Sequence, residues 1–247
     1  MKIAFICGCP RSGTSWTWGL ITSLPKVEPL LIEDFPPTSL PGQVGNMKTE
    51  HGFNTTETTI FFSNLSDAEI RSAVEKKARA FPDHLLIEKT PDNARKLGRI
   101  LEVFPEAKII HVIRNPPANI NSLIQTEFSN GFRFAKDLLD AIRVYREVFN
   151  AALPFENHPA LLRIRYEDLH SAPSEILRKI AAFCGLELLS TEQIQQAIEE
   201  NHQKTKTIQK NIFRLGQVDS YCSELTPSEI TEINSLLSKE IRHYHYD

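Results

Sequence analysis

The stretch that most constrains the fold is residues 3–16, which read IAFICGCPRSGTSW. A short run of strand-forming apolar residues ends at Gly8, and a turn rich in Pro, Arg, Ser and Gly leads into a helical pattern that begins at Thr14. In a strand, loop and helix of this kind, the N–H groups of the loop and of the first helical turn point inward and bind an anion. We therefore expect a phosphate-binding loop, with side-chain donors from Arg11, Ser12, Thr14 and Ser15.

The spacing of the two glycines in this loop, Gly8 and Gly13, is that of the nucleoside-triphosphate P-loop. That motif has Lys and then Ser or Thr directly after the second glycine, whereas Thr14 and Ser15 follow here. The cation is inside the loop instead, at Arg11. This pattern disfavours ordinary nucleotide hydrolysis, and a strand-to-helix turn without a ligand remains the alternative interpretation.

The composition indicates one soluble α/β domain over residues 1–247, with 41% hydrophobic and 24% charged residues. A net charge of −3 excludes a broadly basic nucleic-acid-binding protein, so any anion site must be local. The four cysteines form no Cys-x2-Cys pair, which predicts neither a zinc site nor a disulfide framework and favours a cytoplasmic location. No apolar stretch is long enough to span a bilayer.

Two more strands are expected to end in polar residues at the edge where open α/β sheets bind ligands. Residues 85–87 form a buried strand that is followed by Glu88, Lys89, Thr90 and Pro91, and residues 108–113 form a strand that is followed by Arg114. Arginine suits a phosphate group because its planar fork donates two parallel hydrogen bonds, and a hydroxyl such as Ser122 on the next helix can add a third. His111 lies among apolar neighbours within its strand, so we expect a buried imidazole rather than a catalytic base.

The remaining elements complete a three-layer α/β/α pattern around a central parallel sheet. We expect a fourth strand at residues 161–164 and helices at about 66–79, 134–149, 173–183 and 227–242, the first of them opened by a Ser66 and Glu69 capping box. Residues 25–64 show no periodicity and are predicted to form a long functional loop or a mobile surface loop. Residues 201–211 are polar and basic and are interpreted as a lid.

Several of these segments together resemble the sulfotransferase family. Residues 10–16, PRSGTSW, are similar to its 5′-phosphosulfate loop, and Lys-Thr-Pro at 89–91, Arg114-x7-Ser122 and the Tyr-Glu-Asp-Leu block at 166–169 resemble three further blocks in the same order. The resemblance implies a P-loop-containing nucleotide hydrolase-like fold that binds 3′-phosphoadenosine 5′-phosphosulfate (PAPS) and releases 3′-phosphoadenosine 5′-phosphate (PAP).

The resemblance also assigns coenzyme-binding residues. Arg114 and Ser122 would hold the 3′-phosphate, and Tyr166 would lie near the adenine. Residues 213–226 resemble a segment that folds over the nucleotide, although Leu215 replaces a Lys and Tyr221 replaces a Trp of the family pattern. The full set implied is Arg11, Ser12, Gly13, Thr14, Ser15, Trp16, Arg114, Ser122, Tyr166, Arg214, Leu215 and Gly216.

Sulfuryl transfer by in-line displacement depends on alignment and on donors aimed at the leaving phosphate oxygen, for which Arg11 and Lys89 are candidates and no metal is expected. The acceptor hydroxyl also needs a general base. Cytosolic members of the family use a His after Lys-Thr, where this chain has Pro91, and other branches use a Glu about twenty residues beyond the loop. The candidates here are Glu33 first, then Asp34 and His51.

The sequence therefore predicts a PAPS-dependent sulfotransferase that acts on a hydroxyl group of a small-molecule or carbohydrate acceptor. Two alternatives stay open: a P-loop kinase of small molecules, and a non-catalytic protein that binds PAP or another nucleotide. Neither the identity of the acceptor nor the oligomeric state follows from the sequence.

Overall fold

The computed structural model describes residues 1–36, 58–127, 131, 133–187, 189–207 and 218–246, without the side chains of 204–207. Its centre is a single parallel sheet of five strands in the order β2-β3-β1-β4-β5. The strands are β1 (Lys2–Gly8), β2 (Val27–Pro29), β3 (Leu85–Lys89), β4 (Lys108–Ile113) and β5 (Leu161–Arg165). The predicted parallel sheet is confirmed, and β2 adds a short strand within the stretch that was predicted to be irregular.

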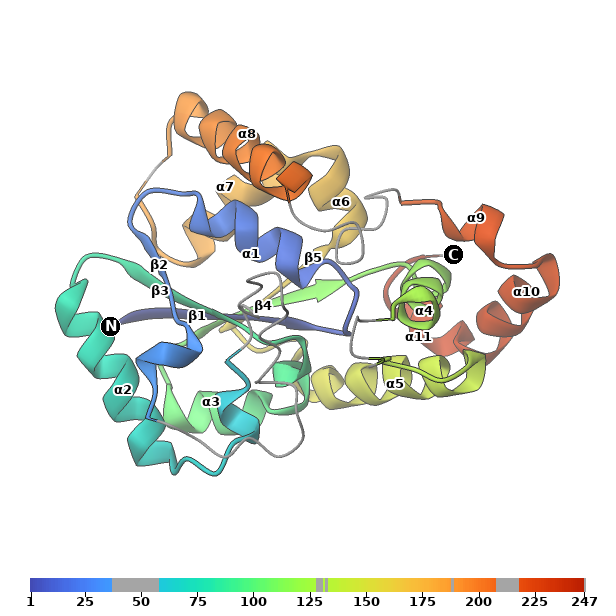
Figure 1. Cartoon of the computed structure of the whole chain (residues 1–247), viewed down its shortest axis with the longest axis horizontal. Coiled ribbons are helices and arrows are strands. Elements are labelled where there is room, and N and C mark those ends of the chain that lie inside the picture. Colours follow the sequence, from blue (N-terminus) through green and yellow to red (C-terminus); the bar gives the residue numbers. More distant parts are fainter. Residues whose placement is uncertain (37–57, 128–130, 132, 188, 208–217, 247) are drawn as a thin grey trace.

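Helices cover both faces of the sheet, so the predicted three-layer α/β/α architecture is confirmed (Figure 1). On one face lie α1 (Thr14–Thr22), α7 (Pro173–Phe183) and α8 (Thr191–Thr207). On the other lie α2 (Asp67–Ala80), α3 (Leu97–Val103) and α5 (Leu138–Ala152). Side chains alternate along β1, so Ile6 packs with the first group of helices and Phe5 with the second.

The other helices are short and lie mostly around the carboxyl ends of the strands. They are α4 (Pro116–Gln125), α6 (Tyr166–Ser171), α9 (Tyr221–Glu224), α10 (Pro227–Leu236) and α11 (Ser238–His243). The described residues also form four 3₁₀ helices in the connections between other elements: η1 (Ile32–Asp34), η2 (Ile60–Phe62), η3 (Pro91–Arg95) and η4 (Leu153–Phe155). None of the described helices is both long and apolar enough to cross a membrane.

Local signals in the sequence placed most of these elements correctly. The capping box that opens α2 is present, with the Glu69 N–H donating to Ser66 Oγ and the Ser66 N–H donating to Glu69 Oε2. The helix predicted at 227–242 is instead two helices, because the fully buried Leu237 has φ −104° and ψ 22° and interrupts the helical path. Helix α8 was not predicted, and it includes residues 201–207 of the segment interpreted as a lid.

The strand register brings the carboxyl ends of the strands together at one edge of the sheet. Ile6 pairs with Lys89 of β3, and Gly8 pairs with Val112 of β4. His111 is buried as predicted, and burial, reinforced by the nearby Arg163, lowers its pKa to about 3. Because His111 is buried and neutral, we look for the functional groups at the carboxyl edge of the sheet instead.

Candidate functional site

The loop between β1 and α1 has the backbone of an anion-binding turn. Arg11 and Gly13 have positive φ angles of 70° and 104°, and Gly13 is the N-cap of α1. A Cβ atom on Gly8 would lie 2.2 Å from the carbonyl oxygen of Val112, and one on Gly13 would lie 2.3 Å from the Tyr166 ring. Both glycines are therefore required for the loop to pass between β4 and α6.

The donors of this loop face a confined space. Ser12 is fully buried and Thr14 is 3% exposed, while Arg11, Ser15 and Trp16 are half-buried. The hydroxyl of Ser12 has no hydrogen-bond partner among the described residues. Because a buried hydroxyl without a partner costs free energy, its presence beside the free N–H groups at the start of α1 indicates a site built for a ligand with acceptor oxygens.

Hydrogen bonds connect this loop to the turn between β4 and α4. Arg11 Nε donates to Ser122 Oγ at 3.3 Å, Arg114 Nη1 donates to the carbonyl oxygen of Arg11 at 3.2 Å, and Asn119 Nδ2 donates to that of Pro10 at 2.9 Å. The structure thus brings together Arg11, Arg114 and Ser122, which lie far apart in the sequence and were predicted to bind two different phosphate groups. Ser122 and Arg114 are each 9% exposed.

The turn at Arg114 is held from behind by a side chain of α5 and a side chain of α6, and the latter is held in turn by Tyr246. The Tyr145 hydroxyl donates to the Arg114 carbonyl at 3.2 Å, and the Asn115 N–H donates to Glu167 Oε1 at 2.9 Å. The second oxygen of Glu167 accepts the hydroxyl proton of Tyr246 at 2.7 Å. Sequence reasoning missed this brace, because it links Asn115 through Glu167 to Tyr246, which is 131 positions further along the chain.

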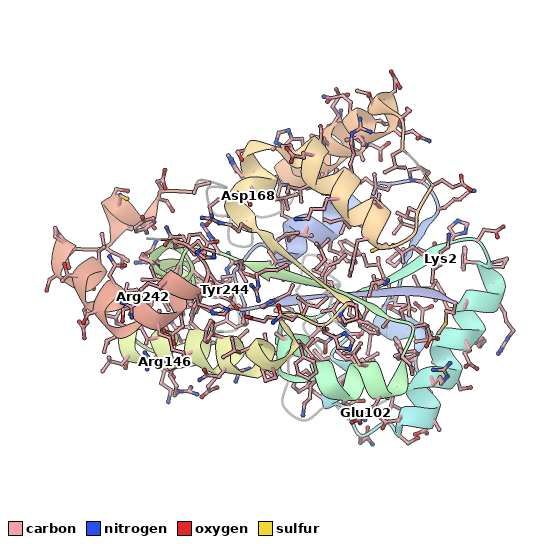
Figure 2. All side chains as sticks on the ribbon, turned by 180° about the vertical axis from the view of Figure 1, so that it is seen from behind. Lys2, Glu102, Arg146, Asp168, Arg242 and Tyr244 are labelled. Carbon is pink, nitrogen blue, oxygen red and sulfur yellow. The ribbon has the colours of Figure 1, made fainter. Side chains whose placement is uncertain are left out.

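The segment that carries Tyr246 packs on the arginines of β5. Arg165 lies 4.1 Å from the centroid of the Tyr246 ring, and Arg163 lies 4.8 Å from that of Tyr244. Figure 2 labels Tyr244 beside the sheet and Asp168 on α6. The brace is therefore anchored by cation–π contacts as well as by hydrogen bonds.

An aromatic group lies beside the loop, at the start of α1 and α6. The rings of Trp16 and Tyr166 are 5.6 Å apart, Trp16 and His170 are 5.8 Å apart, and the Arg114 guanidinium lies 4.5 Å from the Tyr166 centroid. Burial raises the pKa of the Tyr166 hydroxyl, which keeps it neutral. These side chains offer flat apolar surfaces to a heterocyclic base, and His170 is a member that sequence reasoning missed.

The end of β3 carries a second polar group, where Lys89 is 2% exposed and Glu88 is fully buried. Glu88 Oε1 accepts hydrogen bonds from the hydroxyls of Thr58 at 2.7 Å and Thr90 at 2.6 Å, and Oε2 accepts one from Asn93 Nδ2 at 2.6 Å. Burial raises the pKa of the Glu88 carboxyl to about 7, although its hydrogen bonds and Lys89 oppose the shift. Sequence reasoning placed Glu88 at a strand end and assigned it no function.

The candidate bases are placed less favourably. Glu33 is exposed on η1. Asp34 Oδ2 accepts the Leu31 N–H at 2.8 Å, and Oδ1 lies 3.2 Å from Lys77 Nζ, which also pairs with Glu28 of β2. These bonds hold Asp34 beside β2 and the last turn of α2 rather than at the carboxyl edge of the sheet.

Four predicted site residues lie outside the described part of the chain: His51, Arg214, Leu215 and Gly216. Within the described ranges, no three His, Cys, Asp or Glu side chains are grouped so as to hold a metal ion. All four cysteines are free thiols.

Comparison with known sequences agrees with the geometry of the site. The model of the family described as "Sulfotransferase family" matches residues 4–190. A candidate protein-tyrosine sulfotransferase of Caenorhabditis briggsae is 26% identical over 192 residues, which cover 75% of this chain and 66% of that protein. The chain thus spans slightly less than two thirds of the length of this relative.

Solved structures share the same fold. The crystal structure of the mouse sulfotransferase SULT7A1 complexed with PAP has a TM-score of 0.63 at 17% identity, with coverage of 98% of this chain and 85% of that one. The sulfotransferase domain of the olefin synthase of Synechococcus PCC 7002 has a TM-score of 0.61 at 19% identity, with coverage of 96% and 94%. At these identities the likeness concerns the fold.

Proposed function

Since this chain belongs to the sulfotransferase family, we propose that it transfers a sulfuryl group from PAPS to a hydroxyl group of an acceptor. The observation that supports this best is the pair of contacts that joins the two predicted phosphate sites, from Arg11 to Ser122 and from Arg114 to the Arg11 carbonyl. A single nucleotide with phosphate groups on both its 5′ and 3′ sides fits such a pair of neighbouring sites. The solved structure of the mouse relative contains PAP, the desulfated form of this coenzyme.

The residues at the β1–α1 loop fit the 5′ end of the coenzyme. The Ser12 hydroxyl lacks a partner among the described residues, and the N–H groups that begin α1 point out of the helix, so both can donate to phosphate oxygens. Arg114 and Ser122 would hold the 3′-phosphate, with Trp16 and Tyr166 beside the base. Arg214, Leu215 and Gly216 complete the proposed set.

Bound PAPS supplies an activated sulfuryl group whose transfer leaves negative charge on the 5′-phosphate oxygen. Arg11, Thr14 and Lys89 are proposed to donate hydrogen bonds toward that oxygen and so stabilise the charge as it develops. Fixed cations and N–H groups in a water-poor site need no rearrangement during the reaction, which makes this stabilisation effective.

The acceptor hydroxyl loses a proton as it attacks, and Glu33 remains our first proposal for the base, followed by Asp34 and His51. The ion pair and backbone hydrogen bond that occupy Asp34 favour Glu33 of these two. The acceptor is proposed to be a small molecule or a carbohydrate. Because a relative carries the name of a protein-tyrosine sulfotransferase, a tyrosine phenol belongs among the acceptors to be tested.

The proposal is tested by calorimetric titration of the chain with PAP and with ATP and Mg²⁺, followed by transfer assays with ³⁵S-labelled PAPS. The acceptor panel contains phenols, alcohols, a tyrosine peptide and oligosaccharides. We expect PAP binding and transfer to at least one class of hydroxyl. Binding of ATP and Mg²⁺ in place of PAP would instead favour a kinase, and PAP binding without transfer to any acceptor would favour a non-catalytic nucleotide-binding protein.

A further inference from the structure

A buried carboxylate, that of Glu88, lies at the end of β3 and takes no part in the proposed chemistry. Its side chain is fully buried and accepts hydrogen bonds from Thr58, Thr90 and Asn93. An ionised carboxylate can accept all three hydrogen bonds, because both of its oxygens act only as acceptors. Moving such a group out of water costs several kcal/mol, and a pair of apolar residues of similar size is often at least as stabilising. A contribution to the stability of the fold therefore does not by itself explain why position 88 is a glutamate.

Glu88 and Lys89 support the two faces of the same strand end. Leu86 packs with Phe5 in the core on the side of α2 and α3, whereas Ile87 packs with Ile6 on the side of α1. Because side chains alternate along a strand, Glu88 extends to the face of Leu86 and Lys89 to the face of Ile87, which α1 covers. Glu88 thus holds from behind the backbone that presents Lys89 to the β1–α1 loop.

The same carboxylate also binds the segment Thr58–Thr59, which leads into η2. Thr58 donates to Glu88 Oε1, and the N–H of Thr59 donates to Thr90 Oγ1 at 3.1 Å, while Thr90 in turn donates to Glu88. Thr58 is fully buried and Thr59 is 9% exposed. Glu88 therefore joins two segments that are 30 residues apart, the strand end with Lys89 and the start of η2.

We propose that Glu88 is a positioning residue of the transfer site, which fixes the Lys89–Thr90 strand end against Thr58–Thr59 so that Lys89 is held at the reacting sulfuryl group. This inference rests on the proposed function, because Lys89 acts there on the coenzyme. The inference concerns geometry. Without the carboxylate, the Lys89–Thr90 strand end and the Thr58–Thr59 segment separate. Lys89 then loses its alignment, while the arginines and Ser12 keep theirs.

The test uses the full chain with Glu88→Ala, which removes all three hydrogen bonds, and Glu88→Gln, which keeps the shape. The Gln side chain can still accept from Thr58 and Thr90. The Oδ1 atom of Asn93 has no partner among the described residues, so a turned Asn93 amide can accept from the new Nε2 group. Glu240→Gln is the matched control, since Glu240 is 3% exposed and pairs with Arg146 in a different part of the chain.

Three quantities are measured for each variant: the dissociation constant for PAP, kcat with saturating PAPS and acceptor, and hydrogen exchange of the Thr59 amide, followed by NMR. For Glu88→Ala we expect kcat to fall roughly 10- to 100-fold, since a small misalignment of a catalytic group has effects of this order. We expect the PAP dissociation constant to stay within about twofold of wild type and the Thr59 amide to exchange faster. Glu88→Gln should restore most of the protection and part of kcat, and the control should resemble wild type.

The inference is overturned if the Glu88→Ala variant keeps the wild-type exchange rate at Thr59, or if its kcat is unchanged although exchange is faster. If Glu88→Ala does not fold, the same three quantities are measured on two single variants, Glu88→Gln and Thr58→Val, and these values decide whether the inference holds. Thr58→Val removes one donor and leaves the carboxylate in place. Wild-type protein that transfers nothing from PAPS contradicts the proposed function. In that case the exchange at Thr59 still shows whether Glu88 joins the two segments.

Discussion

The two halves of the carboxyl edge are built in different ways. In the half proposed to bind the coenzyme, which we call the coenzyme half, Arg114 donates to the Arg11 carbonyl, Asn119 to the Pro10 carbonyl and Arg11 to the Ser122 hydroxyl. In the acceptor half, around Lys89, a buried carboxylate collects three neutral donors.

We therefore expect the two halves to serve different steps: the coenzyme half binds the nucleotide, and the acceptor half aligns groups for the transfer. Arginine guanidinium groups donate paired hydrogen bonds to phosphate oxygens, so Arg11 and Arg114 suit the binding of a phosphorylated ligand. A carboxylate on the opposite face of the strand from Lys89 instead controls position without forming a direct pair across the site. We therefore expect substitutions of Arg114 and Ser122 to appear mainly in PAP affinity, and substitutions of Glu33 and Glu88 to appear mainly in kcat.

The largest expected effect belongs to Glu33 of η1, the residue proposed as the base. Glu33→Gln should reduce kcat by roughly 10²–10⁴, because a general base contributes about that factor. The affinity for PAP, measured by calorimetry, should remain unchanged. Glu192→Gln, which alters another exposed acid on α8, is the control. A fully active Glu33→Gln enzyme moves the role to Asp34 or His51, and a large loss of PAP affinity would break the separation of the two halves.

The second effect is on stability and follows from the pKa of Glu88. Burial raises this pKa from 4.5 to about 7, so the folded chain holds the proton more tightly than the unfolded chain. The contribution of Glu88 to the free energy of unfolding is complete below the unfolded pKa and is lost as the pH rises through the folded pKa, a change of about 3 kcal/mol. Glu88→Gln removes this titration.

Relative to wild type, Glu88→Gln should therefore gain about 2–3 kcal/mol in unfolding free energy between about pH 5 and about pH 8. Urea denaturation at the two pH values measures the difference. His111, with a pKa lowered to about 3, changes protonation in the unfolded chain of both proteins and cancels. A difference that does not vary with pH would mean that Glu88 titrates normally, and it would remove the contrast between a buried acid and the cations of the coenzyme half.

In the coenzyme half, Arg114→Ala should weaken PAP binding by roughly 10- to 100-fold, the range expected for a hydrogen bond between charged groups. With PAPS at saturation, kcat should fall much less. Arg178→Ala provides the control, because Arg178 is exposed and binds the Leu189 carbonyl and the Thr191 hydroxyl. Equal losses in affinity and kcat would show that Arg114 also serves the reaction.

The smallest effect is expected for Ser122→Ala, which removes one neutral hydroxyl. Its bond from Arg11 is long at 3.3 Å, so PAP affinity should fall only about 3- to 10-fold. Calorimetry on the single variants and on the double variant with Arg114→Ala would show whether the two residues act on one phosphate group. Purely additive losses would argue for separate contacts.

The sequence indicated the position of Arg11, Arg114 and Ser122 in the fold better than it indicated the surroundings of Glu88, for a physical reason. The loop at Gly8 to Trp16 and the pair Arg114 and Ser122 follow their strands directly, so local patterns place them at the edge of the sheet. The local pattern places Glu88 at a strand end but does not predict its hydrogen-bond partners, because nothing near it in the sequence shows that Thr58 and Asn93 will surround it.

The same limit applies to the helices and to the candidate bases. The ion pair between Asp34 and Lys77 forms because α2 packs against η1. The sequence does not show this contact, so Asp34 could be judged as a candidate base only from the chemistry of its carboxylate. The break at Leu237 and the helix α8 likewise follow from burial against neighbouring elements rather than from local pattern.

The hydrogen bond from Tyr246 to Glu167, and from there to the Asn115 backbone, gives the 3′-phosphate turn a dependence on the order of synthesis. Residues up to Asn115 leave the ribosome before Tyr246 does. The turn at Asn115 acquires its rear support only when that tyrosine emerges. The turn that we propose to hold the 3′-phosphate therefore gains its full set of hydrogen bonds only after Tyr246 has folded back onto Glu167.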